Sequence, residues 1–290
     1  MTTITADFVS SCLPKRPHDA HKGTMGTMLN ISGSYAMAGA CILSSMSALK
    51  SGVGLLKVAL PHSIYQIVAS SVFEAVFVPV SESEKGTVDV NSLDFLLDIS
   101  KSAQSILLGC GLKFCEETID FTKKFVTACT TPLLVDADGI NALSQNINVL
   151  KDTSAPVVLT PHIKEMSRLC KKSVEYIISH KSEVAENFAK EYQCVVVLKG
   201  KDTIVTDGDN TFVNPTGNSG MAKGGSGDVL SGIIASLMAQ GVPPLESACA
   251  SVYIHGLAGD MASKKLSKTS MLPRDIVGFL PDVFKSIESK

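Results

Sequence analysis

The sequence predicts an α/β fold with a mainly parallel central sheet and an antiparallel hairpin at one edge. Runs of β-branched and aliphatic residues alternate with segments of helical periodicity, which is the pattern of parallel βαβ units. Two short β-prone segments flank the turn residues Asp207-Gly208-Asp209-Asn210, and this arrangement predicts the hairpin. No linker, repeat or low-complexity tract interrupts the pattern. We therefore expect one domain over residues 1–290, with residues 1–20 as an N-terminal extension.

The predicted strands are short apolar runs bounded by turn residues. They are Met28–Ile31, Leu55–Leu60, Ala75–Val80, Ser105–Leu108, Pro132–Asp136, Pro156–Thr160 and Cys194–Leu198, with the hairpin strands Ile204–Thr206 and Thr211–Val213. Helical stripes lie between several of them, at residues 37–49, 166–170 and 184–192. The last clear helix begins at Ser226 or Gly227 and stops at Gly241, because apolar residues recur at helical spacing between these points.

Charge and cysteine usage exclude several classes of protein. The 26 basic and 28 acidic side chains give a net charge of −2, so the chain has no general attraction for nucleic acid or an anionic membrane. The charge-free stretch from Thr24 to Leu49 is long enough to cross a bilayer, but turn residues at its centre predict a strand, a turn and a helix instead. The eight cysteines form no CxxC pair, which argues against a zinc cluster and favours free thiols in the cytoplasm.

Small, polar or charged residues follow each of the main predicted strands. In open parallel sheets, ligands bind at the carboxyl ends of the strands, so these residues are expected to meet around one site. The clusters are Ser32-Gly33-Ser34, Gly109-Cys110-Gly111, Asp136-Ala137-Asp138, Pro161-His162 and Lys199-Gly200-Lys201.

The glycine-rich segment from Asn214 to Asp228 carries the strongest functional signal. It precedes an amphipathic helix, so its backbone amides can approach a ligand where the helix dipole is positive. This arrangement predicts an anion hole, although it matches neither a Walker A pattern nor a Rossmann GxGxxG. Asp228 falls in the first helical turn, where it either stabilises the helix dipole or accepts a proton from a substrate hydroxyl.

The other candidates each have a functional and a structural interpretation. Lys199 is placed either to reach a nucleotide phosphate or to sit in a solvated loop. His162 and Glu165 flank a strand-to-helix junction, where they are either site residues or a loop residue and a first-turn acid. Asp136 and Asp138 either hold hydrated Mg²⁺ or cap the next helix. His255, on an apolar helix, is interpreted as a hydrogen-bonded core histidine.

Taken together, these segments resemble a known family. The resemblance is carried by His21-Lys22-Gly23, Gly33-Ser34 with Met37 to Ala40, Val135 to Asp138, Thr160-Pro161-His162 with Glu165, Leu198-Lys199-Gly200 and Gly217 to Asp228, in that order. The chain is similar to the ADP-dependent (S)-NAD(P)H-hydrate dehydratases of the ribokinase-like superfamily over about residues 20–285. The resemblance implies a three-layer αβα sandwich.

The resemblance also implies repair of damaged nicotinamide cofactor. The expected substrate is NADH hydrate (NADHX) or NADPH hydrate (NADPHX), which carries a 6-hydroxyl where water has added to the ring. The expected enzyme phosphorylates that hydroxyl from ADP or ATP with Mg²⁺ and then eliminates phosphate, because phosphate is a better leaving group than hydroxide. The activity is thus that of a carbon-oxygen lyase.

The family's motif positions assign roles by resemblance. Asp228 matches the base that also contacts substrate, and Glu165 matches a carboxylate that organises Mg²⁺ through water. The remaining matches are Ala40, Gly111 and His162 for the hydrated dinucleotide, Gly225, Ser226 and Gly227 for the transferred phosphoryl group, and Lys199, Gly200, Lys201, Asp202, Thr203 and again Gly227 for the adenine nucleotide. Lys223 and Ser226 depart from the threonines of many relatives, and Lys223 is left between a phosphate contact and solvent.

Other functions remain open at this stage. The runner-up enzyme is a ribokinase-like small-molecule kinase of the hydroxyethylthiazole or hydroxymethylpyrimidine type, and a third reading is a non-catalytic nucleotide sensor. Many members of the family carry a fused epimerase domain; since about twenty residues precede His21, we expect that activity to be absent. We also expect a homo-oligomer. The sequence does not choose between ADP and ATP or between NADHX and NADPHX.

Overall fold

The computed structural model describes residues 1–288, and its strands form one 10-stranded sheet. The strands are β1 (Thr2–Thr3), β2 (Thr27–Ile31), β3 (Leu55–Pro61), β4 (Val76–Val80), β5 (Ser105–Leu108), β6 (Leu133–Val135), β7 (Val157–Leu159), β8 (Val195–Leu198), β9 (Ile204–Thr206) and β10 (Thr211–Val213). Their order across the sheet is β1-β10-β9-β8-β7-β6-β5-β2-β3-β4. All neighbours are parallel except the pairs formed by β9, which is antiparallel to both β8 and β10.

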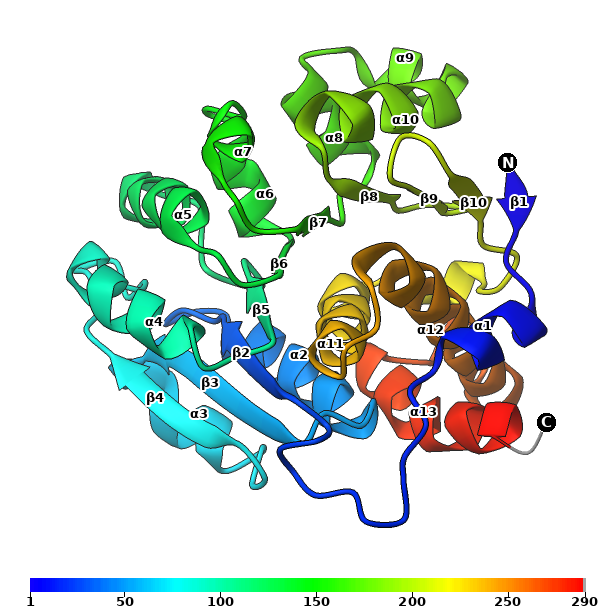
Figure 1. The fold of residues 1–290 in the computed structure, drawn as a ribbon, viewed down its shortest axis with the longest axis horizontal. Coiled ribbons are helices and arrows are strands. Elements are labelled where there is room, and N and C mark those ends of the chain that lie inside the picture. The colour runs from blue at the N-terminus through cyan, green and yellow to red at the C-terminus, as the bar shows by residue number, and fades with distance from the viewer. Residues whose placement is uncertain (289–290) are drawn as a thin grey trace.

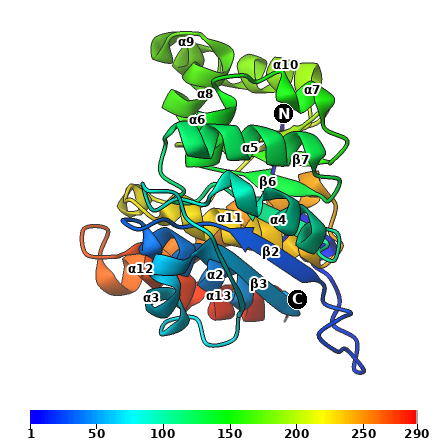
Figure 2. The ribbon, with the colours of Figure 1, turned by 90° about the vertical axis from the view of Figure 1, so that its left-hand side faces the viewer.

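Helices cover both faces of this sheet (Figures 1 and 2). One face carries α1 (Ala6–Cys12), α2 (Ala38–Lys50), α3 (Tyr65–Ala69), α11 (Ser226–Ala239), α12 (Pro244–Leu266) and α13 (Pro273–Glu288). The other face carries α4 (Leu93–Ser100), α5 (Glu116–Ala128), α6 (Asp138–Leu143), α7 (Val149–Asp152), α8 (Ile163–Cys170), α9 (Val174–Ser179) and α10 (Lys181–Tyr192). Each layer buries its own apolar cluster against the sheet, and the three-layer αβα sandwich is therefore confirmed.

Burial on both faces explains why the central strands are nearly continuous apolar runs. All residues of β5, β6, β7 and β8 are buried, as expected for parallel strands covered by helices on both sides. The predicted strands and the hairpin all form, with bounds that differ from the prediction by a residue or two at several ends. Among the described residues, no helix is long and apolar enough to cross a membrane.

The N-terminal segment contributes structure that the sequence pattern did not predict. Strand β1 pairs with β10, outside the hairpin, at the edge of the sheet opposite β4. Ile4 and Val9 of this segment are fully buried in the apolar cluster that contains α11 and α12. Residues 2–12 therefore pack onto the same core as the rest of the described chain.

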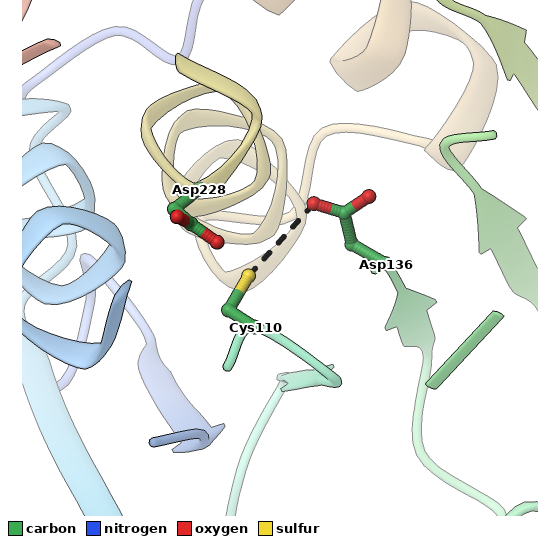
Figure 3. A group of neighbouring side chains, drawn as sticks. All are labelled: Cys110, Asp136 and Asp228. Atoms are coloured by element: carbon green, nitrogen blue, oxygen red, sulfur yellow. Dashed lines mark hydrogen bonds between the residues drawn. The ribbon is translucent and has the colours of Figure 1, made fainter. Parts of the chain in front are cut away.

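The carboxyl ends of β5 and β6 are brought together by close backbone approach. Gly109 has a φ of +130°, and a Cβ there would lie 1.9 Å from the carbonyl oxygen of Asp136. Ala137 is a non-glycine residue with a φ of +49° at the start of α6. Positive φ in a non-glycine residue is strained and is often found at functional sites. The side chains of Cys110 and Asp136 are thereby placed side by side beneath the first turn of α11 (Figure 3).

Candidate functional site

The N-terminus of α11 leaves backbone donors free. The helix starts after Gly225, whose φ of +101° is a left-handed conformation, and a Cβ there would lie 2.7 Å from Leu43. Within residues 1–288, no acceptor is found for the N–H groups of Gly225 and Gly227. The Ser226 hydroxyl is buried and has no partner within the same residues. Free amides at a helix N-terminus can bind an anion, so the donors that the predicted anion hole requires are available, and the anion hole itself stays a prediction.

Asp228 lies in the first turn of α11, and its carboxylate faces Cys110 and Asp136 (Figure 3). One of its carboxylate oxygens lies within 4.8 Å of the Cys110 thiol and of an Asp136 oxygen. Burial, together with the negative charge of Asp136, raises the pKa of Asp228 to about 6. The carboxylate is therefore ionised at neutral pH and is a stronger proton acceptor than an exposed aspartate.

Asp136 is fully buried and holds several donors. Its Oδ1 accepts from Lys199 Nζ at 2.8 Å and from Thr160 Oγ1 at 2.7 Å, and its Oδ2 accepts from Ser231 Oγ at 2.7 Å. Burial alone would raise the pKa of Asp136, but the Lys199 charge and these hydrogen bonds outweigh burial and lower it. Asp136 therefore stays ionised. From the sequence, Asp136 was interpreted as a Mg²⁺ ligand or a helix cap, and its ion pair with Lys199 was not predicted.

Lys199 points inward, whereas the residues after it turn along the surface. A Cβ on Gly227 would lie 3.3 Å from Lys199 Nζ, so the ammonium group and the start of α11 face the same space. Gly200 and Thr203 close a turn through the bond from Thr203 Oγ1 to the Gly200 carbonyl at 3.0 Å. Lys201 and Asp202 are exposed within that turn. In the segment predicted to bind the nucleotide, the Lys199 side chain therefore points inward and the residues after it form an exposed turn.

His162 and Glu165 form a capping box at the start of α8. The ring nitrogen Nδ1 of His162 accepts from the backbone N–H of Glu165 at 3.1 Å, and Glu165 Oε2 accepts from the backbone N–H of His162 at 2.8 Å. Burial raises the pKa of Glu165 to about 7, with Lys199 opposing that shift. Burial also lowers the pKa of His162. The Pro161 carbonyl accepts from the Lys199 amide, so this corner lies directly beside Lys199.

Ala40 and Gly111 lie against each other on the opposite side of the cluster. Gly111 is buried with a φ of +66°, and a Cβ there would lie 2.7 Å from the Ala40 Cβ. The chain around them is held by the hydrogen bond from the Gly33 amide to the Cys110 carbonyl at 2.8 Å. The structure therefore gathers the predicted residues around the carboxyl ends of β2, β5, β6, β7 and β8.

Two further side chains were interpreted from the sequence. Lys223 was left between a phosphate contact and solvent, and its Nζ instead donates to the carbonyls of Thr269 and Met271, both at 2.7 Å, so it ties the glycine-rich segment to the loop before α13. His255 is buried in the core and hydrogen-bonded to the Ser226 backbone, as expected. Its Nε2 has no partner within residues 1–288.

Ser231 is the site residue that sequence reasoning missed, because it lies inside an apolar helix and gave no signal. Cys110 was placed at the site as part of a strand-end cluster, but its side chain was given no role there. The available signal was its position between two glycines directly after a strand, with acidic residues after the next predicted strand.

The fold and the geometry of the site indicate the structural class to which the protein belongs. A free helix N-terminus that carries a carboxylate, set at the carboxyl ends of a mainly parallel sheet, is an arrangement suited to phosphoryl transfer to a hydroxyl. A crystal structure of a ribokinase-like superfamily protein from Enterococcus faecalis matches the chain with a TM-score of 0.85 and 28% identity, over 99% of this chain and 96% of the other. The chain has the ribokinase-like fold.

Sequence comparison assigns the family within that class. Residues 28–282 match the family model described as NAD(P)H-hydrate dehydratase, and the chain belongs to this family. The ADP-dependent (S)-NAD(P)H-hydrate dehydratase of Bacillus subtilis is 30% identical over 286 residues, which are 98% of each chain. The crystal structure of an ADP/ATP-dependent NAD(P)H-hydrate dehydratase from the same organism, co-crystallised with ATP/Mg2+, has a TM-score of 0.84 and 27% identity, over 99% of this chain and 98% of the other.

Longer relatives match as well. The bifunctional NAD(P)H-hydrate repair enzyme of Moorella thermoacetica is 38% identical over 288 residues, which are 99% of this chain and 54% of that protein. The chain spans about half the length of the first curated relatives it matches.

Proposed function

We propose that this chain catalyses the nucleotide-dependent dehydration of (S)-NADH hydrate or NADPH hydrate back to the reduced cofactor. The observation that carries the proposal is the position of Asp228, an ionised, partly buried carboxylate beside the free amides of α11 and the Lys199 ammonium group. This arrangement can take a proton from an alcohol and hold a phosphoryl group at the same point.

The residues act in a definite order in this proposal. Asp228 accepts the proton of the ring 6-hydroxyl while the hydroxyl oxygen forms a bond to the terminal phosphorus of the nucleotide. The bond from that phosphorus to the leaving nucleotide oxygen breaks at the same time. The free amides of Gly225 and Gly227, together with Lys199, stabilise the charge on the migrating phosphoryl group. The Ser226 amide donates to the Lys223 carbonyl at 3.2 Å and would exchange that bond to join them. The carbon–oxygen bond then breaks and phosphate leaves with the electron pair. The adjacent carbon gives up a proton to the departing phosphate or to water, and its electron pair restores the double bond.

Two groups of residues near Asp228 have different proposed binding roles, one for the hydrated dinucleotide and one for the adenine nucleotide. Ala40, Gly111 and His162 would contact the hydrated dinucleotide; they come from α2, from the loop after β5 and from the start of α8. The segment Lys199 to Thr203, with Gly227, would hold the adenine nucleotide. The Lys199 ammonium group already bonds to Asp136 at 2.8 Å, so it is only partly available to bind a nucleotide phosphate. Lys199 would therefore contact a phosphate as a shared cation.

The donor set fits a hydrated Mg²⁺ at Glu165. One oxygen of this buried carboxylate is taken by the His162 amide, while Oε1 has only the His162 ring at 3.5 Å. Asp136 offers no comparable oxygen, because both of its oxygens already accept short hydrogen bonds. Glu165 would hold the ion through water, and the ion would neutralise phosphate charge.

The activity assay separates the candidate functions. The protein is incubated with NADH hydrate and Mg²⁺, with ADP in one arm and ATP in another, and the near-ultraviolet absorbance of the reduced nicotinamide ring is followed. We expect the absorbance to return and inorganic phosphate to appear in equal amount. Accumulation of a stable phosphorylated product would favour the small-molecule kinase, whereas nucleotide binding without turnover of any hydrate would favour the sensor.

We infer a cytoplasmic location from the cysteines, because all eight are free and five are buried, as expected for thiols that are kept reduced in that compartment. The homo-oligomer stays a prediction, which sedimentation of the purified protein measures.

A further inference from the structure

Cys110 occupies a fixed position between two carboxylates. Its chain is bent by Gly109 and Gly111, which have φ values of +130° and +66°, and its carbonyl accepts the Gly33 amide. The side chain is fully buried, and its sulfur lies 3.8 Å from Asp136 Oδ2 and within 4.8 Å of an Asp228 oxygen (Figure 3). A thiol held in this way can donate one proton to one of the two carboxylates at a time.

Of the two carboxylates, Asp228 accepts fewer hydrogen bonds, so it gains more from the thiol proton. Asp136 already accepts three bonds of 2.7–2.8 Å, from Lys199, Thr160 and Ser231, and the hydrogen bond that the Cys110 thiol donates to Asp136 Oδ2 is much longer, at 3.8 Å. The Asp228 carboxylate accepts no short hydrogen bond from the described side chains, and the Cys110 sulfur lies within 4.8 Å of one of its oxygens. The like charge of Asp136 raises the pKa of Asp228, and hydrogen bonding by Cys110 lowers it.

We propose that Cys110 is a positioning residue whose buried thiol donates its proton to the Asp228 carboxylate and holds that carboxylate towards the substrate, beside the like-charged Asp136. The proposal rests on the proposed function, because it concerns the base of that reaction. Cys110 itself touches no reacting atom and forms no covalent bond.

The electrostatics of the surrounding elements agree with a protonated thiol. Burial, followed by the charges of Asp228 and Asp136, raises the pKa of Cys110 well above its usual value, so the thiol keeps its proton at neutral pH. The other titratable groups facing Asp228 are Lys199 at the end of β8, Asp138 at the start of α6 and Cys41 on α2. The Cys110 hydrogen bond lowers the pKa of Asp228 against burial and against the charge of Asp136.

The test compares Cys110→Ala and Cys110→Ser with the wild type. In Cys110→Ala, the acidic limb of kcat/KM for hydrate dehydration should move to higher pH by about one unit, the size expected from loss of a hydrogen bond to a charged group. In Cys110→Ser, the limb should stay in place or move to lower pH, because a hydroxyl is a better donor than a thiol. Cys249→Ala is the matched control, since Cys249 is fully buried on α12 with no contact to the site, and its profile should match the wild type.

A carbon-detected NMR titration of the Asp228 carboxyl group gives a second measurement that does not depend on turnover. If the titration and the acidic limb of Cys110→Ala both coincide with the wild type, Cys110 has no positioning role. If Cys110→Ser moves as far upward as Cys110→Ala, the volume of the thiol and not its proton is what matters, and the proposal is again overturned. Absence of hydrate turnover in the wild type, with an upward titration shift in Cys110→Ala, would overturn the proposed function and leave the contact between Cys110 and Asp228 standing.

Discussion

Lys199 Nζ lies 2.8 Å from Asp136 Oδ1, and this ion pair joins the ends of β8 and β6 directly beneath the first turn of α11. The Asp136 side chain is 1% exposed and that of Lys199 is 19% exposed. Two oppositely charged groups are thus kept out of bulk water next to the glycine-rich segment. The pair fixes a positive charge where a phosphoryl group would bind, while the negative partner raises the proton affinity of Asp228.

Breaking this pair should destabilise the fold. Asp136→Asn leaves the Lys199 ammonium group without its partner, and loss of one member of a buried pair costs about 3–5 kcal/mol. Urea unfolding at neutral pH measures the change. The surface pair of Lys124 and Asp120, also 2.8 Å apart but about half exposed, is the matched control; Asp120→Asn should change the free energy of unfolding by less than about 1 kcal/mol. Equal effects for the two variants would contradict this account.

The same pair sets a pH dependence of stability. The pKa of Asp136 is lowered in the folded protein, so its contribution is fully present above the ordinary aspartate value of 3.8 and is lost as pH falls through the lower, folded value. The wild type should therefore lose stability in acid more steeply than Asp136→Asn. Denaturant titrations at several pH values measure the two slopes, and parallel slopes would refute the assignment.

Activity should rise with pH through the ionisation of Asp228. The carboxylate acts as a base only when ionised, and burial raises its pKa to about 6. We therefore expect kcat/KM to fall below about pH 6 and to be level just above it. Initial rates with saturating nucleotide give the profile. An acidic limb near the value of an exposed aspartate would show that a different group is the base.

His162 combines a structural role with a proposed binding role, and two substitutions separate them. His162→Ala removes the cap of α8 and should lower stability by about 1 kcal/mol. His162→Asn keeps a capping side chain, so stability should change little. If the ring contacts substrate, both variants should raise KM for the hydrate by a similar factor while kcat changes less. An unchanged KM in His162→Asn would restrict His162 to capping.

Gly111 should not tolerate a side chain. In Gly111→Ala the new Cβ would lie 2.7 Å from Ala40, and the φ of +66° is strained for alanine. We expect a loss of about 1–2 kcal/mol and a raised KM for the hydrate. Gly278→Ala on α13 is the control, because no atom lies within 4 Å of the added methyl group and helix propensity favours alanine. A Gly111→Ala variant as stable and active as Gly278→Ala would contradict the proposed contact.

The sequence predicted the fold well where periodicity was strong. The strands β2 to β8 stood out as short apolar runs, most clearly β5 to β8, which are buried on both faces, and the hairpin stood out because of its turn residues. Strand β1 was missed because two residues are too short to show any alternation. Helix α12 was not described because small and polar residues, such as Ser247, Ser251 and Gly256, interrupt its apolar stripe while being buried.

The site was predicted in its location more than in its contacts. Strand ends are local, so the clusters following each strand could be read directly. Which charges pair across strands depends on register and side-chain direction, and these are set by the whole sheet. Lys199 was therefore assigned to a nucleotide by resemblance although it bonds to Asp136, and the position of the Cys110 thiol between two carboxylates was not predicted.

The central claim is that Asp228 removes a proton from a bound alcohol, and Asp228→Asn tests it most directly. The amide keeps the shape of the side chain and cannot act as the base. Hydrate turnover should fall by about 10²- to 10⁴-fold, while the Kd for ADP measured by calorimetry stays close to that of the wild type. Asp282→Asn, an exposed position on α13, controls for the loss of a carboxylate elsewhere. Wild-type turnover in Asp228→Asn would contradict the account.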